Sequence, residues 1–97
     1  MFIVSLTYKK PLEEVDKYIQ PHSDFLDKQY QAKKFIFSGR KNPRTGGLIA
    51  AYNVTKAELE NIITQDPFYQ NGIADYEITE IIPTKYDNNF ASFVTQS

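Results

Sequence analysis

The sequence predicts a single α+β domain in which two helices cover one face of a four-stranded antiparallel sheet. Length is the first reason, because 97 residues suit one domain and leave no room for two. The second reason is periodicity: segments with an apolar residue at every second position alternate with segments where the spacing is three or four. The third is the order of these segments, β-α-β-β-α-β, which is the ferredoxin-like arrangement.

The first strand and the first helix occupy the N-terminal third of the chain. Residues 2–8 predict a strand, because Phe2, Val4 and Leu6 alternate with less apolar residues and form one buried face. A helical stripe follows. Pro21 interrupts it, so we expect either a kink or a fresh helical segment with Pro21 in its first turn. The stripe consists of Leu12, Val15, Tyr18, Ile19, His22, Phe25 and Leu26.

Three more strands follow from composition and turn signals. Residues 35–40 and 47–54 predict two strands that form a hairpin, because the segment 41–46 between them is polar and contains proline and glycine. Residues 74–83 predict the last strand. With the first strand, these complete the four-stranded sheet.

The second helix has clear signals at both ends. Thr55 and Glu58 have the spacing of a capping box, in which each side chain satisfies a backbone N–H of the first turn. Asp66 and Pro67 end the helix, because the residue before a proline is disfavoured in helical geometry. The apolar residues that this helix should bury are Leu59, Ile62 and Ile63.

We expect the domain to span residues 1–85 and a polar C-terminal tail to span residues 86–97. Phe90 and Phe93 stand out in this tail, and we expect them to pack on a dimer partner or over the mouth of a pocket. A homodimer is expected because the sheet face without helices needs a cover. Our strand phases place Ile3, Ile36, Ile49 and Ala51 on that face.

Composition excludes several classes of function. A formal net charge of −1 argues against a nucleic-acid binder, and the absence of cysteine excludes disulfides and thiolate chemistry. One histidine without cysteine cannot form a conventional zinc site, and we find no phosphate-binding loop or nucleophile elbow. We therefore expect no metal and no cofactor. Without a signal peptide or an apolar run that could span a membrane, a cytoplasmic location is expected.

His22 is the first candidate for chemistry. It is the only histidine, and it lies on the apolar stripe of the first helix, so it is either a core residue with a satisfied ring or a functional one. Pro21 favours the second interpretation, because a histidine near a helix start tends to stay neutral. A neutral imidazole can act as a base near pH 7.

Asp66 is the candidate partner of His22. It can be a structural residue whose carboxylate accepts local backbone N–H groups at the helix end, or it can orient the imidazole. Asp24 is a weaker alternative, because a residue two positions along a helix points away from His22.

Ser38, Gly39 and Arg40 end the second strand and form the third candidate. Phe35 and Phe37 should face the helices, which places Ser38 and Arg40 on the opposite face of the sheet. Together with Lys41 and Arg44, these residues either bind a small anion or form a solvated loop.

Taken together, these motifs resemble the YciI-like family over residues 2–85. The matching segments are Pro21-His22-Ser23-Asp24-Phe25-Leu26, Ser38-Gly39-Arg40, Asn42-Pro43-Arg44-Thr45-Gly46-Gly47 and Asp66-Pro67-Phe68 followed by Gly72. The resemblance implies a ferredoxin-like fold assembled as a dimeric α+β barrel, similar in architecture to muconolactone isomerase. It also implies a histidine/aspartate-centred site, here His22 and Asp66. At least one member of the family is a dehydrochlorinase that acts on a chlorinated hydroxyquinol.

Three functions remain open. The first is a small cofactor-free enzyme that uses His22 and Asp66 for elimination or isomerisation of a small polar or anionic, possibly aromatic, substrate held by Ser38, Gly39 and Arg40. The second is a homodimer that binds a small metabolite without catalysis, and the third is a structural role. We expect the His22 ring to lie within one hydrogen bond or one bridging water of the Asp66 carboxylate, and both residues to border a cavity near Ser38 and Arg40.

Overall fold

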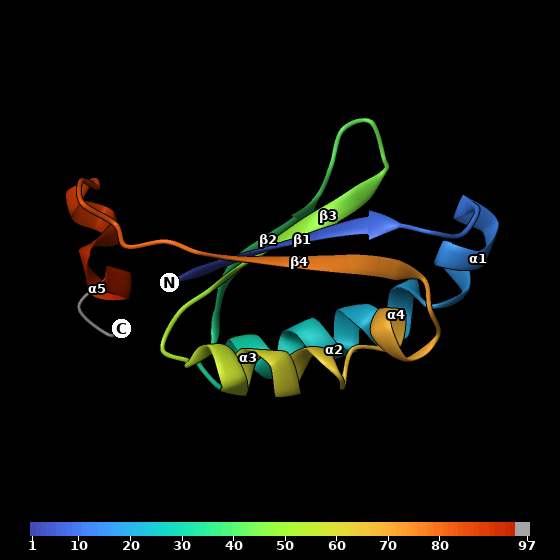
Figure 1. The fold of residues 1–97 in the computed structure, drawn as a ribbon, viewed down its shortest axis with the longest axis horizontal. Helices are drawn as coiled ribbons and strands as arrows, with labels where there is room; N and C mark the ends of the chain where they lie inside the picture. Colours follow the sequence, from blue (N-terminus) through green and yellow to red (C-terminus); the bar gives the residue numbers. More distant parts are fainter. Residues whose placement is uncertain (95–97) are drawn as a thin grey trace.

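A four-stranded antiparallel sheet organises the fold, with its strands in the order β2-β3-β1-β4. The computed structural model describes residues 1–94. The strands are β1 (Phe2–Tyr8), β2 (Phe35–Arg40), β3 (Gly46–Ala51) and β4 (Ala74–Glu80). The helices are α1 (Leu12–Lys17), α2 (Ile19–Gln31), α3 (Lys56–Ile63), α4 (Pro67–Gln70) and α5 (Ala91–Val94), with a 3₁₀ turn η1 (Asn88–Phe90) before α5. Helices α2, α3 and α4 lie on one face of the sheet (Figure 1), which confirms the predicted ferredoxin-like α+β class.

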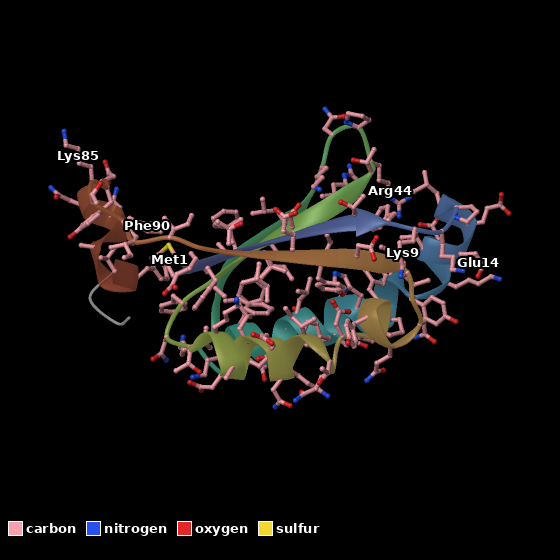
Figure 2. The ribbon with its side chains drawn as sticks, viewed as in Figure 1. Met1, Lys9, Glu14, Arg44, Lys85 and Phe90 are labelled. Carbon is pink, nitrogen blue, oxygen red and sulfur yellow. The ribbon has the colours of Figure 1, made fainter. Side chains whose placement is uncertain are left out.

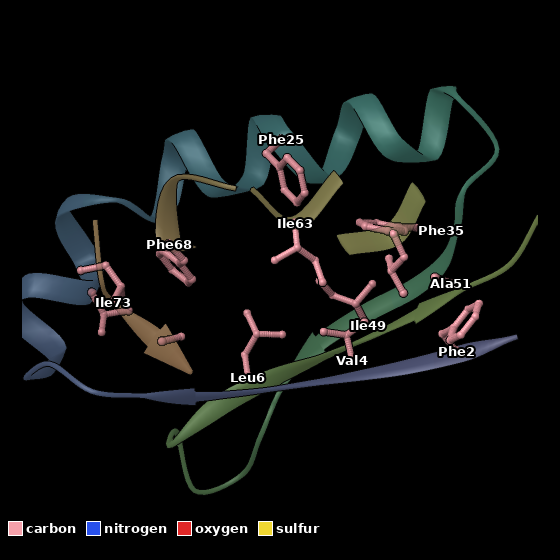
Figure 3. Packing of buried hydrophobic residues seen from close by; sticks show 13 residues of the cluster. Phe2, Val4, Leu6, Phe25, Phe35, Ile49, Ala51, Ile63, Phe68 and Ile73 are labelled. Carbon is pink, nitrogen blue, oxygen red and sulfur yellow. The ribbon is translucent and has the colours of Figure 1, made fainter. Parts of the chain in front are cut away.

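The hydrophobic core lies between the sheet and these helices. Phe2, Val4 and Leu6 alternate along β1 as predicted, and all three are buried. Phe25 reaches this layer from α2 and Phe68 reaches it from α4 (Figure 3). Each large apolar side chain that is fully buried here stabilises the fold by about 1.5–3 kcal/mol.

The first helical stripe is split into two helices. Helix α1 ends at Lys17, and Tyr18 leaves helical geometry with a φ of −114°. Helix α2 then begins at Ile19 and carries Pro21 in its first turn, where the missing backbone N–H costs nothing. The second of the two alternatives for Pro21 is therefore the correct one. As a result, His22 lies in the first turn of the longest helix.

Strand β2 contains a β-bulge that the sequence analysis missed. Phe35 and Phe37 pair with consecutive residues of β3, so Ile36 is an extra residue without a partner. The bulge reverses the alternation of the residues that follow it. Phe37 is therefore 52% exposed on the open face, whereas Ser38 and Arg40 lie on the helix-covered face. Our prediction that Phe37 faces the helices and that Ser38 and Arg40 face away from them was wrong.

The phase of β3 also differs from our prediction. Ile49 pairs with the buried Val4, and Ala51 pairs with the buried Phe2, so both belong to the core and not to the open face. The two glycines that begin β3 show no alternation, and the four apolar residues after them fit either phase. The open face instead carries Ile3, Phe37, Leu48 and Ala50. Strands β3 and β4 end three residues earlier than predicted.

The capping box of α3 is present as predicted. Glu58 N–H donates to the Thr55 hydroxyl at 3.1 Å, and Thr55 N–H donates to the Glu58 carboxylate at 3.0 Å. Leu59 and Ile63 are buried against the sheet. After α3, Asp66 does more than end a helix, because it is the N-cap of α4 and Pro67 is the first residue of that helix.

The C-terminal segment lies at the end of the sheet opposite to α1 (Figure 1). Figure 2 shows Phe90 and Lys85 at this end, whereas Arg44 and Glu14 lie at the other. The Phe93 ring packs edge-on against Tyr52 of the same chain, with 5.1 Å between ring centroids. Within one chain, Phe93 thus packs on the domain itself. The expectation that the tail packs on a dimer partner or over a pocket mouth stays a prediction, and residues 95–97 lie outside the described part. No helix within residues 1–94 is long and apolar enough to cross a membrane.

Candidate functional site

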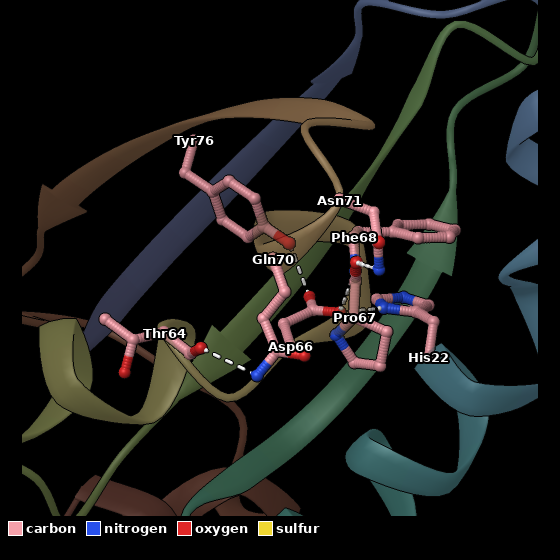
Figure 4. Close-up of polar contacts among 8 residues, drawn as sticks. All are labelled: His22, Thr64, Asp66, Pro67, Phe68, Gln70, Asn71 and Tyr76. Carbon is pink, nitrogen blue, oxygen red and sulfur yellow. Dashed lines mark hydrogen bonds and ion pairs between the residues drawn. The ribbon is translucent and has the colours of Figure 1, made fainter.

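His22 and Asp66 are in direct contact, as the sequence analysis predicted. The His22 Nδ1 atom lies 2.7 Å from Asp66 Oδ1 (Figure 4). The rival partner, Asp24, is exposed and accepts a hydrogen bond from Gln20 at 3.0 Å instead. The chain therefore brings together two groups that are 44 positions apart in the sequence.

Asp66 is held by three donors although its side chain is fully buried. Besides the His22 ring, the Phe68 backbone N–H donates to Oδ1 at 2.9 Å and the Tyr76 hydroxyl donates to Oδ2 at 2.5 Å. The exposed fraction of Asp66 is 0%. Burial of a carboxylate is costly unless its oxygens are hydrogen-bonded, and here both of them are. The same carboxylate thus caps α4 and contacts the imidazole, so the structural and the orienting interpretations hold together.

These contacts define which nitrogen of His22 is free. A carboxylate can only accept hydrogen bonds, so Nδ1 must donate to it. The neutral ring then has its proton on Nδ1 and a lone pair on Nε2. The plane of the ring is fixed as well, because it stacks on Phe68 with a centroid distance of 4.0 Å and an angle of 3°.

A cavity of about 170 Å³ lies between α2 and the strands β1, β2 and β3. The His22 side chain is 14% exposed and borders this cavity. Asp66 does not line the cavity, because it lies behind the His22 ring, so the expectation that both residues border it was wrong for Asp66. The polar lining comes from His22, Ser38 and Arg40, and the apolar lining includes Leu6, Leu26 and Ile49.

Gly47 keeps the cavity open. Gly47 pairs with Leu6 and so occupies a position on the helix-covered face where any other residue would place a side chain in the cavity. A Cβ atom at Gly47 would lie only 2.9 Å from the backbone oxygen of Gly39. Gly39 also borders the cavity, but a Cβ atom there would meet nothing within 4 Å.

Ser38 has a partner that the sequence analysis missed. The Tyr30 hydroxyl lies 2.6 Å from Ser38 Oγ. Tyr30 follows His22 by eight residues and Leu26 by four, so the helical period places all three on one face of α2. That spacing is the signal that could have identified Tyr30.

Arg40 and Arg44 have different environments. Arg44 forms an ion pair with Asp16 at 2.5 Å, and this hydrogen bond raises the pKa of its guanidinium. It therefore holds the hairpin loop against α1. Arg40 is exposed, borders the cavity and has no ion pair within residues 1–94. Of the two arginines considered for anion binding, only Arg40 has a guanidinium that is available to a ligand in the cavity.

Tyr76 is the second residue of the site that the sequence analysis missed. It lies on β4 in the register position opposite Leu6 and so faces the helices. Burial, together with the charge of Asp66, raises the pKa of the Tyr76 phenol. The hydroxyl therefore keeps its proton and acts as a donor. No group of three or more His, Asp or Glu side chains within residues 1–94 is arranged to hold a metal ion.

Comparison with known proteins gives one family. The family model described as a YCII-related domain matches residues 1–82, so the chain belongs to this family, and the resemblance stated above is confirmed. No curated protein matches the chain.

Proposed function

We propose that this member of the YCII-related family is a small cofactor-free enzyme in which His22 moves a proton on a small anionic substrate. The observation that carries the proposal is the 2.7 Å contact between His22 Nδ1 and the buried Asp66, in a histidine that also borders a cavity. Asp66 orients the imidazole and stabilises the imidazolium that forms when Nε2 accepts a proton. His22 is therefore the catalytic base, and Asp66 is its positioning residue.

Substrate binding is assigned to the polar residues of strand β2. Arg40 supplies a guanidinium for a carboxylate or another oxyanion, and Ser38 supplies a hydroxyl whose position is set by Tyr30. Gly39 lets the substrate approach the backbone. A cavity of about 170 Å³ is smaller than the roughly 300–1,000 Å³ that is typical of drug-sized ligands, which supports a small substrate.

Elimination or isomerisation fits this set of groups. In an elimination, His22 Nε2 takes a proton from the substrate, the electron pair forms a new double bond, and the leaving group departs with its bonding electrons. In an isomerisation, the imidazolium returns the proton to another carbon. Neither reaction needs an oxidant, a reductant or a metal ion, and a base positioned in this way contributes about 10²–10⁴-fold to the rate.

We also propose that two copies of the chain pair through the open face of the sheet. Support comes from the aromatic and aliphatic side chains on that face, above all Phe37, which is 52% exposed. Ile3 and Leu48 lie on the same face. A contiguous apolar surface of this kind needs a cover, and a second copy supplies it with the same patch on both subunits.

Two probe reactions test the catalytic proposal. The purified chain is incubated with a chlorinated hydroxyquinol, and chloride release is measured for elimination. A muconolactone is followed by its ultraviolet absorbance for isomerisation. The proposal predicts turnover of at least one probe, and His22→Asn should lower kcat/KM by about 10²–10⁴-fold.

Matched variants separate the roles of the site residues. Asp66→Asn should lower kcat, whereas Asp24→Asn, the exposed aspartate two residues from His22, should leave kcat/KM unchanged. Arg40→Met should raise KM, and Arg44→Met should have a smaller effect because Arg44 is bound to Asp16. Full activity of His22→Asn would overturn the proposal. Saturable binding of the probes without turnover would overturn it in favour of the non-catalytic metabolite-binding homodimer.

A further inference from the structure

The second oxygen of Asp66 has a donor of its own. Oδ1 accepts from both the His22 ring and the Phe68 backbone N–H, whereas Oδ2 accepts from the Tyr76 hydroxyl at 2.5 Å (Figure 4). The two donors on Oδ1 restrain rotation of the carboxylate about the Cβ–Cγ bond from one side only. The Tyr76 hydroxyl adds a restraint on Oδ2, so the plane of the carboxylate is held from both sides.

We propose that Tyr76 is a positioning residue of the His22 site that acts through Asp66, an inference that rests on the proposed function. The Tyr76 hydroxyl holds the carboxylate plane so that Oδ1 faces Nδ1 of the imidazole. This arrangement keeps the proton on Nδ1 and leaves the lone pair on Nε2 available to accept a proton. The chain of contacts thus runs from strand β4 through α4 to the first turn of α2.

The location of Tyr76 makes this role testable. Tyr76 does not line the cavity that His22 borders, so it cannot act on a substrate in that cavity directly. It borders a separate hollow of about 260 Å³ between α3, α4 and β4, together with Tyr69 and Ile63. Any effect of its hydroxyl on His22 must therefore pass through Asp66.

Removing the hydroxyl has a definite consequence for the imidazole. In Tyr76→Phe, Oδ2 loses its hydrogen-bond donor. We expect the carboxylate to rotate toward another donor, which weakens the hydrogen bond from His22 Nδ1–H to Oδ1. The tautomer with the proton on Nε2, which cannot accept a proton from a substrate, then becomes populated. A hydrogen bond to a charged group is worth enough to shift such an equilibrium by roughly tenfold or more.

The test uses ¹⁵N NMR, because His22 is the only histidine of the chain and gives one pair of ring-nitrogen signals. The two chemical shifts report the tautomer populations directly, without a substrate. We expect the Nδ1–H form to dominate in the unmodified chain, and the population of the Nε2–H form to rise about tenfold in Tyr76→Phe. Tyr69→Phe is the matched control, since its ring contacts Tyr76 with 5.8 Å between centroids but donates no hydrogen bond to Asp66. Its spectrum should equal that of the unmodified chain.

A second measurement keeps the inference testable if Tyr76→Phe does not fold. In the unmodified chain, the hydroxyl proton of Tyr76, held by the short hydrogen bond to the buried Asp66, should appear at low field and exchange slowly with water. A rapidly exchanging hydroxyl, or unchanged tautomer populations in a folded Tyr76→Phe, would overturn the positioning role. Neither result depends on the activity of His22→Asn, so the proposed function is tested separately by the turnover assay.

Discussion

Replacing Asp66 by alanine tests how far the fold depends on its most buried polar group. The change removes the N-cap of α4, which is typically worth about 1 kcal/mol. It also leaves the Tyr76 hydroxyl and the His22 Nδ1–H without their acceptor in the protein interior. Each unpaired buried donor costs about 1–3 kcal/mol, although both side chains can move partly to relieve it. We therefore expect Asp66→Ala to lower the free energy of unfolding by roughly 3–5 kcal/mol.

Asp66→Asn provides a graded comparison. The asparagine oxygen can still accept from the Phe68 N–H, and its amide can donate to a Tyr76 hydroxyl that has turned to accept. Only the charge and some of the hydrogen bonds around residue 66 are lost, so we expect the free energy of unfolding to decrease by roughly 1–2 kcal/mol. Asp24→Ala removes an exposed carboxylate from the same region and should change the free energy of unfolding by less than about 0.5 kcal/mol.

Urea unfolding followed by circular dichroism measures these differences. All variants must be compared at one protein concentration, because a dimer would make the midpoint depend on concentration. For a domain of this size, a loss of 3–5 kcal/mol corresponds to a decrease in melting temperature of roughly 12 °C or more. If Asp66→Ala stays within about 0.5 kcal/mol of the unmodified chain, the three hydrogen bonds do not stabilise the fold and the argument fails.

Three further predictions concern other parts of the fold. The hydrogen bond from the N-cap backbone lowers the pKa of Glu58, so its stabilising contribution is complete above the ordinary glutamate pKa and is lost as the pH falls through the lowered value. The melting-temperature difference between the unmodified chain and Glu58→Gln should therefore shrink in acid, and a constant difference would contradict this. Phe37→Ser should raise the dimer dissociation constant by about 100-fold or more in analytical ultracentrifugation, whereas Tyr69→Ser, on the helical layer, should not. Gly47→Ala should lower the free energy of unfolding by about 1–3 kcal/mol and abolish probe binding measured by calorimetry. Gly39→Ala should leave the free energy of unfolding nearly unchanged, and an equal loss of stability in both variants would refute the assignment of the close contact to Gly47.

Local patterns were sufficient to predict the order of the strands and helices. The bounds of β1 and β2 agree with the predicted ranges, and a polar segment that contains proline follows each strand. The capping box at Thr55 also placed the start of α3 correctly. These features depend on residues close together in the sequence, and periodicity and capping are local properties.

The faces of β2 and β3 could not be predicted in the same way. A bulge is defined by the pairing of two strands, so one extra residue in β2 has no signal in β2 alone. In β3, four consecutive apolar residues fit both phases, and only the pairing of Ile49 with Val4 decides between them. Errors of this kind matter because a one-residue change of phase moves every following side chain to the other face.

Part of the site could be predicted from sequence, and part of it required the fold. His22 and Asp66 were identified by residue type and motif, and their contact was predicted correctly. Tyr76 carried no such signal, because a tyrosine on an alternating strand is ordinary core material until its hydroxyl is seen to reach Asp66. The complete burial of Asp66 was also unexpected, since acidic residues are rarely buried unless they are paired.

Ser38 and Arg40 follow the bulge at Ile36 and lie on the same face of the sheet as the helices. Two single-residue deletions in β2 test whether ligand binding depends on that face or on the bulge itself. Phe35 and Phe37 already pair with consecutive residues of β3, so deleting Ile36 joins them in a regular strand without changing the faces of the residues that follow. The Ile36 deletion variant should fold, and its free energy of unfolding should fall by at most about 1.5 kcal/mol because the isoleucine is only half-buried. Deleting Gly39 instead moves Arg40 to the open face, because every residue of a strand changes face when the register slips by one. We expect the Gly39 deletion, and not the Ile36 deletion, to abolish binding of muconolactone, the probe with a carboxylate, in calorimetry. If the Ile36 deletion folds normally by NMR but no longer binds the probe, the reasoning is wrong. Binding would then depend on the geometry of the bulge and not only on the face on which Arg40 lies.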